Sequence, residues 1–370
     1  ENAKRAFKAR NYDKKAPRDE ASFKHQDEHV EFVRRKGFSP FQLRLVNSIL
    51  EDVLVMHNSL DRAYAYWFNK VKIDPVEQGF LIKQGFLICQ INFMFSRLSL
   101  FAFVSNLKRP SDFERHVGRL TFSYCAYKDW PLPELEGEEG FDRRGLKKRI
   151  AQANDEPLYK DGCPLWLQEL GVAELKGKWD EQRQALGQES KRFIRTNTLK
   201  GTREELAHLL SEEGVVTKPV AGVPLALEVT SNSALFRTKA FKEGRFEQQD
   251  AGSQMIGAFV DAKPGQRVVD TCAGAGGKTL QLAASMAGKG VIIAMDTESW
   301  KLEDLKKRAK RAGAFNIETR LIDSTKVVKR MAGTADTVLI DAPCSGTGVI
   351  RRMPDSKWRD GREHYKELIS

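Results

Sequence analysis

The sequence has 370 residues, which is too long for one ordinary domain and is typical of two or three. Its 41% hydrophobic and 30% charged residues are typical of a soluble globular protein with sizeable apolar cores. The formal net charge of +11 indicates a polyanionic partner, and it favours nucleic acid over an anionic membrane surface.

Cysteine spacing and hydropathy exclude two kinds of protein. The five cysteines form no CxxC pair and no metal-ligand spacing, so we expect no metal site. Their odd number, without a secretory signal, indicates a reducing compartment and predicts a cytoplasmic protein. Residues 80–107 are the most apolar stretch, but polar residues interrupt it well before about 18 apolar residues in a row, so it predicts core helices and no membrane span.

The N-terminal part divides into a tail and a helical domain. Residues 1–38 are densely charged and predict a solvated basic tail; contact with phosphates is the alternative. Residues 39–155 predict an all-helical domain, because apolar residues recur at spacings of three and four. Asp74–Glu77 is similar to a capped helix start, and Pro110 predicts the start of a helix that runs to Tyr124. Nothing in this domain looks catalytic.

Residues 156–250 predict linker helices followed by a small α/β module. The alternating run from 193 to 200 predicts a strand, and Ala226–Val229 predicts another. Between them, Thr202–Glu205 is a capping box that opens a helix over Leu206–Glu213. We interpret Phe246–Asp250 as a polar turn.

Residues 251–370 alternate regularly between strands and helices. This pattern predicts the first part of a Rossmann-like, parallel, doubly wound α/β sheet, which binds ligands beyond the carboxyl ends of its strands. An aspartate stands at the end of each expected strand: Asp270, Asp296, Asp323 and Asp341. One such aspartate is more often a helix N-cap, but four at one edge favour a ligand site.

The glycine-rich turn Cys272–Lys278 follows the first of these strands. Its glycines let backbone N–H groups approach a nucleotide-like ligand. A P-loop is excluded because its first glycine falls on Cys272, and the dinucleotide pattern GxGxxG fails as well. S-adenosylmethionine fits better: Lys278 suits a carboxylate, and Asp296, about twenty residues further on, suits both ribose hydroxyls. Asp323 is placed to reach the adenine edge.

Asp341–Gly348 is a second sharp motif, in which an aspartate, a proline and a thiol follow a strand end. A lone cysteine is usually a small buried hydrophobe, but the place of Cys344 after this strand favours a functional role. Arg351, Arg352 and the run Lys357–Arg359 add positive charge with an interleaved indole, as expected of an RNA-facing rim.

At these motifs the chain resembles the Nop/Sun, or RsmB-type, RNA 5-methylcytosine methyltransferases. Cys272–Lys278 is similar to the family's cofactor loop, which usually has proline where this chain has Ala275. Asp341–Arg352 closely resembles the family's Pro-Cys motif. Arg195–Lys200 and Gln249–Gln254 resemble its RNA-side module, and the helical N-terminal part is similar in kind to the NusB-like RNA-binding domain of bacterial members.

The resemblance implies S-adenosylmethionine as the cofactor, RNA as the partner, and catalytic roles for Cys344, in product release, and for Asp341, at the cofactor and the base. The cofactor-binding residues expected from the turn and the strand ends are Cys272, Ala273, Gly274, Ala275, Gly276, Gly277, Lys278, Asp296, Asp323 and Asp341. The family's attacking thiol belongs to a Thr-Cys motif after the next strand. That motif is not in the printed sequence, so we expect the sequence to be truncated before it and unable to complete the reaction as printed.

We therefore expect an enzyme of ribosomal RNA processing that methylates cytosine C5 in RNA, acting as a cytoplasmic monomer without a membrane partner. The alternative is a non-catalytic RNA-binding or assembly protein that retains a methyltransferase fold. Methylation of an exocyclic amine is a weaker option, because such sites usually carry Asn/Asp-Pro-Pro-aromatic and Asp341–Cys344 does not match.

Overall fold

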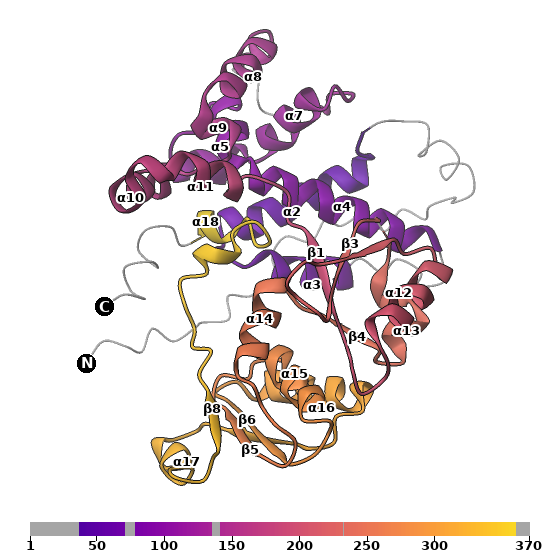
Figure 1. Ribbon diagram of the computed structural model, residues 1–370. Coiled ribbons are helices and arrows are strands. Elements are labelled where there is room, and N and C mark those ends of the chain that lie inside the picture. Colours follow the sequence, from indigo (N-terminus) through magenta and orange to yellow (C-terminus); the bar gives the residue numbers. More distant parts are fainter. Residues whose placement is uncertain (1–36, 71–77, 135–140, 232, 360–370) are drawn as a thin grey trace. The chain divides into compact units, whose positions relative to one another are not determined.

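The computed structural model describes residues 37–70, 78–134, 141–231 and 233–359, and Figure 1 shows its ribbon. The chain forms two compact units, Glu1–Cys163 and Pro164–Ser370. The described part of the first unit is helical, and the second unit is α/β. The four-part division expected from the sequence, with boundaries after residues 38, 155 and 250, stays a prediction.

The described part of the first unit is built from helices. They are α2 (Pro40–Leu54), α3 (Leu60–Lys70), α4 (Gln78–Ser96), α5 (Leu98–Val104), α6 (Pro110–His116), α7 (Gly118–Tyr127), α8 (Leu146–Asp155) and α9 (Pro157–Lys160). At the start of α2, Ser39 Oγ accepts from the Gln42 N–H at 3.3 Å, and Gln42 Oε1 accepts from the Ser39 N–H at 2.9 Å, which closes a capping box. The basic tail up to residue 36 and the expected cap at Asp74–Glu77 lie outside the described residues.

The helix predicted from Pro110 to Tyr124 is two helices, so this prediction was wrong in one respect. Helix α6 ends at His116 and α7 begins at Gly118. Glycine has a low helix propensity because its backbone loses the most freedom on folding, and the break falls beside it.

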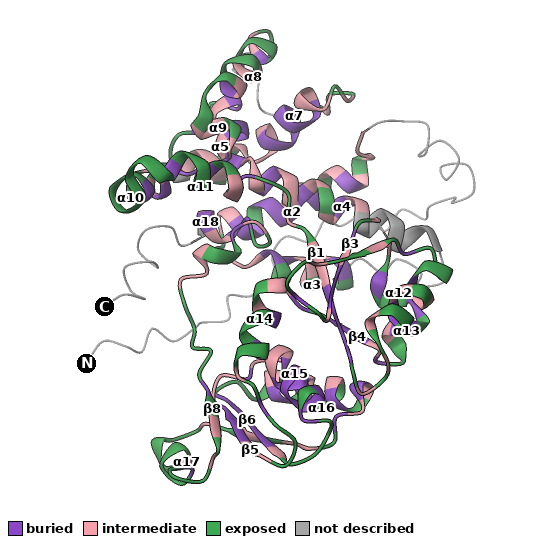
Figure 2. Cartoon of the chain, viewed as in Figure 1, coloured by how far each residue is buried: buried purple, intermediate pink, exposed green. Residues whose placement is uncertain are grey.

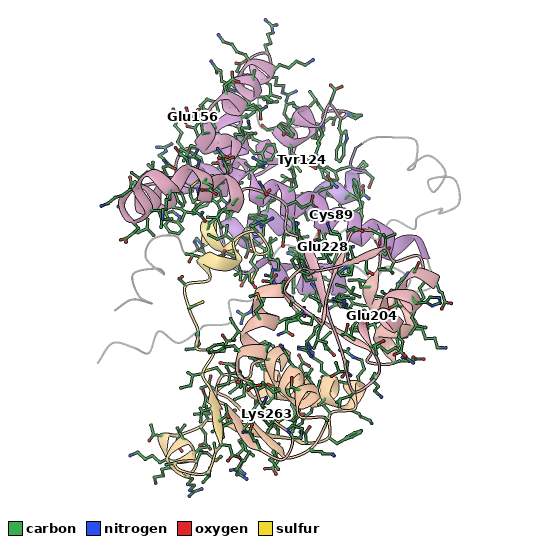
Figure 3. The ribbon with its side chains drawn as sticks, viewed as in Figure 1. Cys89, Tyr124, Glu156, Glu204, Glu228 and Lys263 are labelled. Atoms are coloured by element: carbon green, nitrogen blue, oxygen red, sulfur yellow. The ribbon has the colours of Figure 1, made fainter. Side chains whose placement is uncertain are left out.

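Aromatic side chains fill the core of the first unit around Tyr124, which is labelled in Figure 3. Its ring centroid lies 5.5 Å from that of Phe101 and 5.6 Å from that of Trp130. Burial raises the pKa of the neighbouring Cys125 to about 12, so this thiol is an apolar core group and not a nucleophile. In the described ranges no single helix is both long and apolar enough for a membrane span; the bent pair Phe86–Ser96 and Leu98–Val104 reaches that length only together, with a 76° angle.

The second unit begins with helices and an antiparallel sheet. Helix α10 (Leu165–Leu175), a 3-10 turn and α11 (Trp179–Leu186) come first. The strands β1 (Arg192–Thr196), β2 (Thr217–Pro219), β3 (Ala226–Val229) and β4 (Phe246–Gln248) pair in the order β2-β3-β1-β4, and helices α12 (Arg203–Glu212) and α13 (Lys239–Lys242) accompany them. Ile194, Leu206 and Phe246 belong to one apolar cluster, so the helices cover one face of this sheet. The predicted capping box is present: Thr202 Oγ1 accepts from the Glu205 N–H at 3.2 Å, and Glu205 Oε2 accepts from the Thr202 N–H at 2.8 Å.

The polar turn predicted at Phe246–Asp250 is wrong, because its first three residues form strand β4. This strand pairs with β1, with Ile194 opposite Gln248 and Thr196 opposite Phe246. Polar residues in the segment suggested exposure, but Glu247 is only 2% exposed, because charged partners from elsewhere in the unit surround it.

The rest of the second unit is the predicted Rossmann-like parallel sheet. Its strands β5 (Arg267–Asp270), β6 (Val291–Asp296), β7 (Ile317–Leu321) and β8 (Thr337–Leu339) lie in the order β7-β6-β5-β8, and each pair is parallel. Helices α14 (Ala251–Phe259), α15 (Gly277–Ser285), α16 (Ser299–Ala312) and α17 (Thr325–Lys329) alternate with them. Figure 2 shows its buried strand residues, which alternate between two apolar clusters: Val268 and Ile292 in one, Val269 and Ile293 in the other. The strand order reverses at β5, and ligands of such sheets bind outside the carboxyl ends at this point.

Candidate functional site

The turn between β5 and α15 is held to the carboxyl ends of both neighbouring strands. The Thr271 N–H donates to the last carbonyl of β8 at 3.0 Å, and the Ala273 N–H donates to a carbonyl near the end of β6 at 2.9 Å. Gly276 has φ +89°, and a Cβ there would lie 2.7 Å from Cγ of Leu305 on α16. A side chain at residue 276 would therefore be strained and crowded, so glycine is required for the turn to pack on α16.

Two other glycines leave space instead. A Cβ at Gly274 or at Gly277 would meet no atom within 4 Å. Gly277 is also the first residue of α15, where backbone N–H groups lack an intrahelical acceptor and the helix dipole favours negative charge. The open side of the turn can thus receive a ligand with an anionic group.

Asp296, the last residue of β6, organises the turn with both carboxylate oxygens. Its Oδ2 accepts from the Gly274 N–H at 2.9 Å, and its Oδ1 accepts from the Glu298 N–H at 2.9 Å. Lys301 Nζ lies 3.8 Å from Oδ1. A carboxylate has about four lone-pair sites, so acceptor capacity remains for hydroxyl groups of a ligand.

Lys278 and Asp341 form an ion pair at the reversal point of the sheet. Their Nζ and Oδ2 atoms are 2.6 Å apart, and the two residues are separated by 63 positions in the sequence. The lysine side chain is 14% exposed and the aspartate side chain 48% exposed. The ammonium group therefore lies at a surface opening with one anionic partner and further donor capacity.

Asp270, the last residue of β5, carries an unusual buried carboxylate. It is 1% exposed; its Oδ2 accepts from the Thr279 hydroxyl at 2.7 Å, while no described residue donates a hydrogen bond to Oδ1. Burial raises the pKa of this carboxyl above its ordinary value, although hydrogen bonds from the Thr279 hydroxyl and the Cys272 N–H offset part of the effect. A buried oxygen without a partner is costly, which is the state expected of a group that awaits a cationic ligand.

The carboxylates of Asp270 and Asp341 and the ammonium group of Lys278 meet in one cavity of about 100 Å³. It is lined by Ser253, Asp270, Cys272, Ala273, Gly277, Lys278 and Asp341. Five of these are residues that the sequence predicted for cofactor binding. Ser253 and Asp270 are not among the residues predicted for cofactor binding, although the sequence places Asp270 at the end of a strand. The sequence showed its position but not its burial or its free oxygen.

Several predicted site residues lie away from this cavity. Asp323 is exposed and accepts from the Ser324 hydroxyl at 3.0 Å. Cys344 is an exposed thiol on the loop after β8. Gly274, Gly276 and Asp296 shape the turn itself, as described above. The assignment of all these residues to cofactor or catalysis stays a prediction.

The basic rim predicted after Cys344 is only partly exposed. Arg352 forms an ion pair with Asp250 at 3.1 Å, and Arg351 donates to the carbonyl of Glu189 at 2.7 Å. Lys357 is 4% exposed, so it cannot face RNA as predicted. These contacts instead attach the segment that follows the Pro-Cys motif to the rest of the second unit.

Within the described residues, no group of three or more histidine, cysteine, aspartate or glutamate side chains could hold a metal ion. The polar groups of the site are carboxylates, one ammonium and backbone N–H groups. They suit an organic ligand that carries both charges and hydroxyls.

Two family profiles match this chain. Residues 258–369 match the 16S rRNA methyltransferase RsmB/F profile. Residues 163–235 match the ferredoxin-like domain of RsmF/B-like methyltransferases. The first match contains the parallel sheet and its glycine turn, and the second contains most of the antiparallel module.

Known proteins are similar over part or most of the chain. The chain is 35% identical over 168 residues to "Probable ribosomal RNA small subunit methyltransferase B" of Synechocystis, which covers 45% of this chain and 38% of that protein. It is 30% identical over 232 residues to ribosomal RNA small subunit methyltransferase B of Serratia proteamaculans, and the match covers 62% of this chain and 53% of that protein. The chain thus spans about half the length of the curated relatives it matches, or less. The solved structure of PH0851 has a similar fold, with a TM-score of 0.68 and 23% identity over 90% of this chain and 81% of that one.

Proposed function

We propose that the chain, whose two parts match RsmB/F-family profiles, binds S-adenosylmethionine and methylates cytosine C5 in ribosomal RNA. The observation that carries the proposal is the cavity at the reversal point of the parallel sheet. There a buried carboxylate with a free oxygen and a lysine ammonium face the same space.

The residues present fit the amino-acid end of this methyl donor. Oδ1 of Asp270 would accept from the ammonium group, which would supply the partner that this buried oxygen lacks. Lys278 would hold the carboxylate, helped by the N–H groups at the start of α15. When bound, S-adenosylmethionine supplies an electrophilic methyl group on a positively charged sulfur.

The ribose end would lie at Asp296. Its carboxylate is fixed by the N–H groups of Gly274 and Glu298, so it needs no reorganisation to accept from the ribose hydroxyls. The space beside Gly274 gives the ligand a close approach to the backbone. Asp323 would contact the adenine side, as expected from its place after the next strand.

The base would be placed over Asp341. Its carboxylate is oriented by Lys278 and remains about half exposed, so it can orient a cytosine ring at the opening of the cavity. Cys344 is an exposed thiol three residues further along the same loop, where it can reach a base and assist product release. Both roles come from the family's pattern.

Donor binding is the first test. Calorimetry with S-adenosylmethionine should show one site, and D270N should weaken binding at least about tenfold, because a charge-assisted hydrogen bond is worth about 1.5–3 kcal/mol. D304N, at an exposed carboxylate on α16, is the control and should bind normally. If the chain binds RNA but shows no heat with the methyl donor, the proposal is wrong and the non-catalytic alternative is favoured.

The target atom has its own test. Because the printed sequence lacks the family's Thr-Cys motif, the test uses a longer version of the protein that contains it. Ribosomal RNA of the small subunit is incubated with methyl-tritiated donor and this protein, and the modified positions are mapped by bisulfite sequencing. Label in the RNA without any protected cytosine would exclude cytosine C5, while leaving the donor site unaffected.

A further inference from the structure

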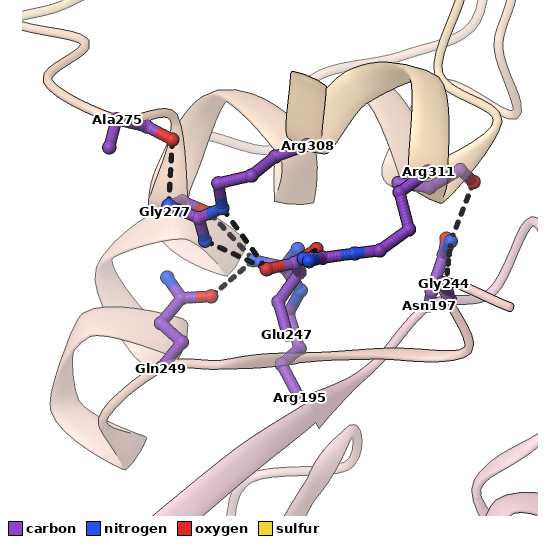
Figure 4. Close-up of polar contacts among 10 residues, drawn as sticks. Arg195, Asn197, Gly244, Glu247, Gln249, Ala275, Gly277, Arg308 and Arg311 are labelled. Carbon is purple, nitrogen blue, oxygen red and sulfur yellow. Dashed lines mark hydrogen bonds and ion pairs between the residues drawn. The ribbon is translucent and has the colours of Figure 1, made fainter. Parts of the chain in front are cut away.

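A buried charged cluster lies against the glycine turn, and the proposed reaction does not use it. It consists of Arg195 on β1, Glu247 on β4, and Arg308 and Arg311 on α16 (Figure 4). Arg195 is 1% exposed and Glu247 2% exposed. Burial lowers the pKa of Arg195 to about 10, so the guanidinium stays charged at neutral pH. Such groups are costly to bury unless each finds partners.

Two hydrogen bonds connect this cluster to the glycine turn. Nη1 of Arg308 donates to the carbonyl of Ala275 at 2.7 Å, and Nη1 of Arg195 donates to the carbonyl of Gly277 at 2.7 Å. In a trans peptide the following N–H points away from the carbonyl. The N–H of Lys278 is therefore directed away from Arg195, and Lys278 itself lines the cavity.

Glu247 and Gln249 hold the two arginines in these orientations. Oε2 of Glu247 accepts from Nε and Nη2 of Arg308 at 3.2 and 2.8 Å, which leaves Nη1 for the turn. Gln249 accepts from Arg195, and it donates to the Ser253 hydroxyl at 3.1 Å. Since Ser253 lines the cavity, the cluster is connected to the site through Gln249 as well as through the turn.

Arg308 and Arg311 differ in one respect that makes them a matched pair. Both pair with Glu247, and their side chains are 24% and 23% exposed. Arg308 also contacts the turn, whereas Arg311 lies over the ring of Phe241, with 3.9 Å between its Cζ and the ring centroid. Removing either one weakens the same ion cluster, but only the loss of Arg308 frees a carbonyl of the turn.

We propose that Arg195 and Arg308 are positioning residues that fix the backbone of the glycine turn. The small α/β module would then complete the methyl-donor site and would not serve only as a separate RNA-binding part. This inference rests on the proposed function where it concerns affinity for the methyl donor. Its structural half, the ordering of the turn, does not depend on that function.

The test compares R308M with R311M. Both variants should lower the melting temperature by a similar amount, because each removes one partner of Glu247. R308M should weaken binding of S-adenosylmethionine about tenfold in calorimetry, the loss expected for one hydrogen bond to a charged group, and R311M by less than about twofold. Equal losses of affinity in both variants, or none in R308M, would overturn the inference.

A conservative variant separates charge from geometry. R308K keeps a positive charge beside Glu247 but lacks the planar fork that reaches two acceptors at once. It should melt close to the unchanged protein and still bind the methyl donor as weakly as R308M. Full affinity in R308K would show that only charge matters and would contradict positioning. For the buried Arg195, R195K is the corresponding variant, and it should also reduce affinity without loss of the folded state.

Hydrogen exchange provides a readout that needs no methyl donor. In the free protein, peptides that cover residues 271–280 should exchange faster in R308M than in R311M, because the turn loses its anchor. If the unchanged chain fails to bind the methyl donor, the proposed function falls, and the positioning inference is then decided by this exchange difference alone. Identical exchange in the two variants would refute it.

Discussion

The antiparallel sheet β2-β3-β1-β4 and the parallel sheet β7-β6-β5-β8 each have four strands, but they carry their buried charges in different places. In the antiparallel sheet the charges lie within the strands, at Arg195 and Glu247. Arg195 donates to Gln249 and to the Gly277 carbonyl, and Glu247 pairs with two arginines of α16. In the parallel sheet the buried residues inside strands β5 and β6 are apolar, and the buried carboxylates of Asp270 and Asp296 stand at the ends of these strands.

This difference separates two uses of buried charge. The charges within the antiparallel sheet pair with charged and polar groups inside the protein, so they join one part of the unit to another, although Nε of Arg195 has no hydrogen-bond partner among the described residues. The charge at the end of β5 is left with an oxygen that has no protein partner, so it is available to a ligand. We expect substitutions in the first group to cost stability and substitutions in the second to cost binding.

The largest loss of stability is expected for the E247Q variant. The variant leaves the cluster's arginines without their buried anion, and breaking such a pair typically costs about 3–5 kcal/mol in free energy of unfolding. Denaturation in urea at neutral pH measures it. The control is E228Q, on strand β3 of the same sheet and labelled in Figure 3, whose lysine partners lie 3.4 and 3.6 Å away near the surface. E228Q should lower the free energy of unfolding by at most about 1 kcal/mol. An equal loss in both variants would show that the buried pairs stabilise the fold no more than the pairs near the surface.

Next in size is G276A, in the glycine turn. It combines a positive φ of +89° with a Cβ 2.7 Å from Leu305, so we expect a loss of about 2–4 kcal/mol from strain and overpacking. G265A is matched in φ, at +90°, but its Cβ would meet nothing within 4 Å, and it should lose only about 1–2 kcal/mol. Urea midpoints measured side by side should differ; coincident midpoints would mean that α16 yields to the added methyl group.

D270N should change stability in the opposite direction. Because the pKa of Asp270 is raised above its ordinary 3.8, the native state holds this proton more tightly than the unfolded state does. The stability of the unchanged protein therefore falls as pH rises from about 3.8 through the raised value, and the penalty is complete above it. D270N removes the penalty and should be more stable by about 1 kcal/mol at neutral pH, since neutralising a strained buried charge is often stabilising.

Thermal unfolding of D270N and the unchanged protein from pH 3 upward measures this gain. The difference should vanish below the ordinary carboxyl range and grow with pH. A variant less stable than the unchanged protein at neutral pH would show that the Asp270 carboxylate is a structural group like those of the antiparallel sheet.

The smallest effect is expected for T202A, at the start of α12. The variant removes one half of a capping box and should cost about 1 kcal/mol in free energy of unfolding. S324A is the control, because Ser324 is the N-cap of α17 without a side-chain capping hydrogen bond, and its loss should be a few tenths of a kcal/mol. If both cost the same, the capping box contributes nothing at this exposed position.

Local patterns were enough to predict much of the second unit. The strand Ala226–Val229 and the helix start at Thr202 have the bounds expected from the sequence, because alternation and capping depend on neighbouring residues. The parallel order of strands and helices after residue 251 followed from the same kind of pattern. Strand β4 was missed, since Glu247 is compatible with a strand interior only when arginines from another element surround it.

In the candidate site, too, some features follow from the local sequence and others only from the tertiary structure. The residue types at the strand ends, and the glycines between β5 and α15, were fixed by the local sequence and pointed to S-adenosylmethionine before any fold was known. Only the tertiary structure placed Lys278 against Asp341, 63 positions away, and left one oxygen of Asp270 without a partner beside the cavity. The reason is physical: a strand-end pattern determines which groups reach an edge of the sheet, while burial and pairing depend on packing between segments that are distant in the chain.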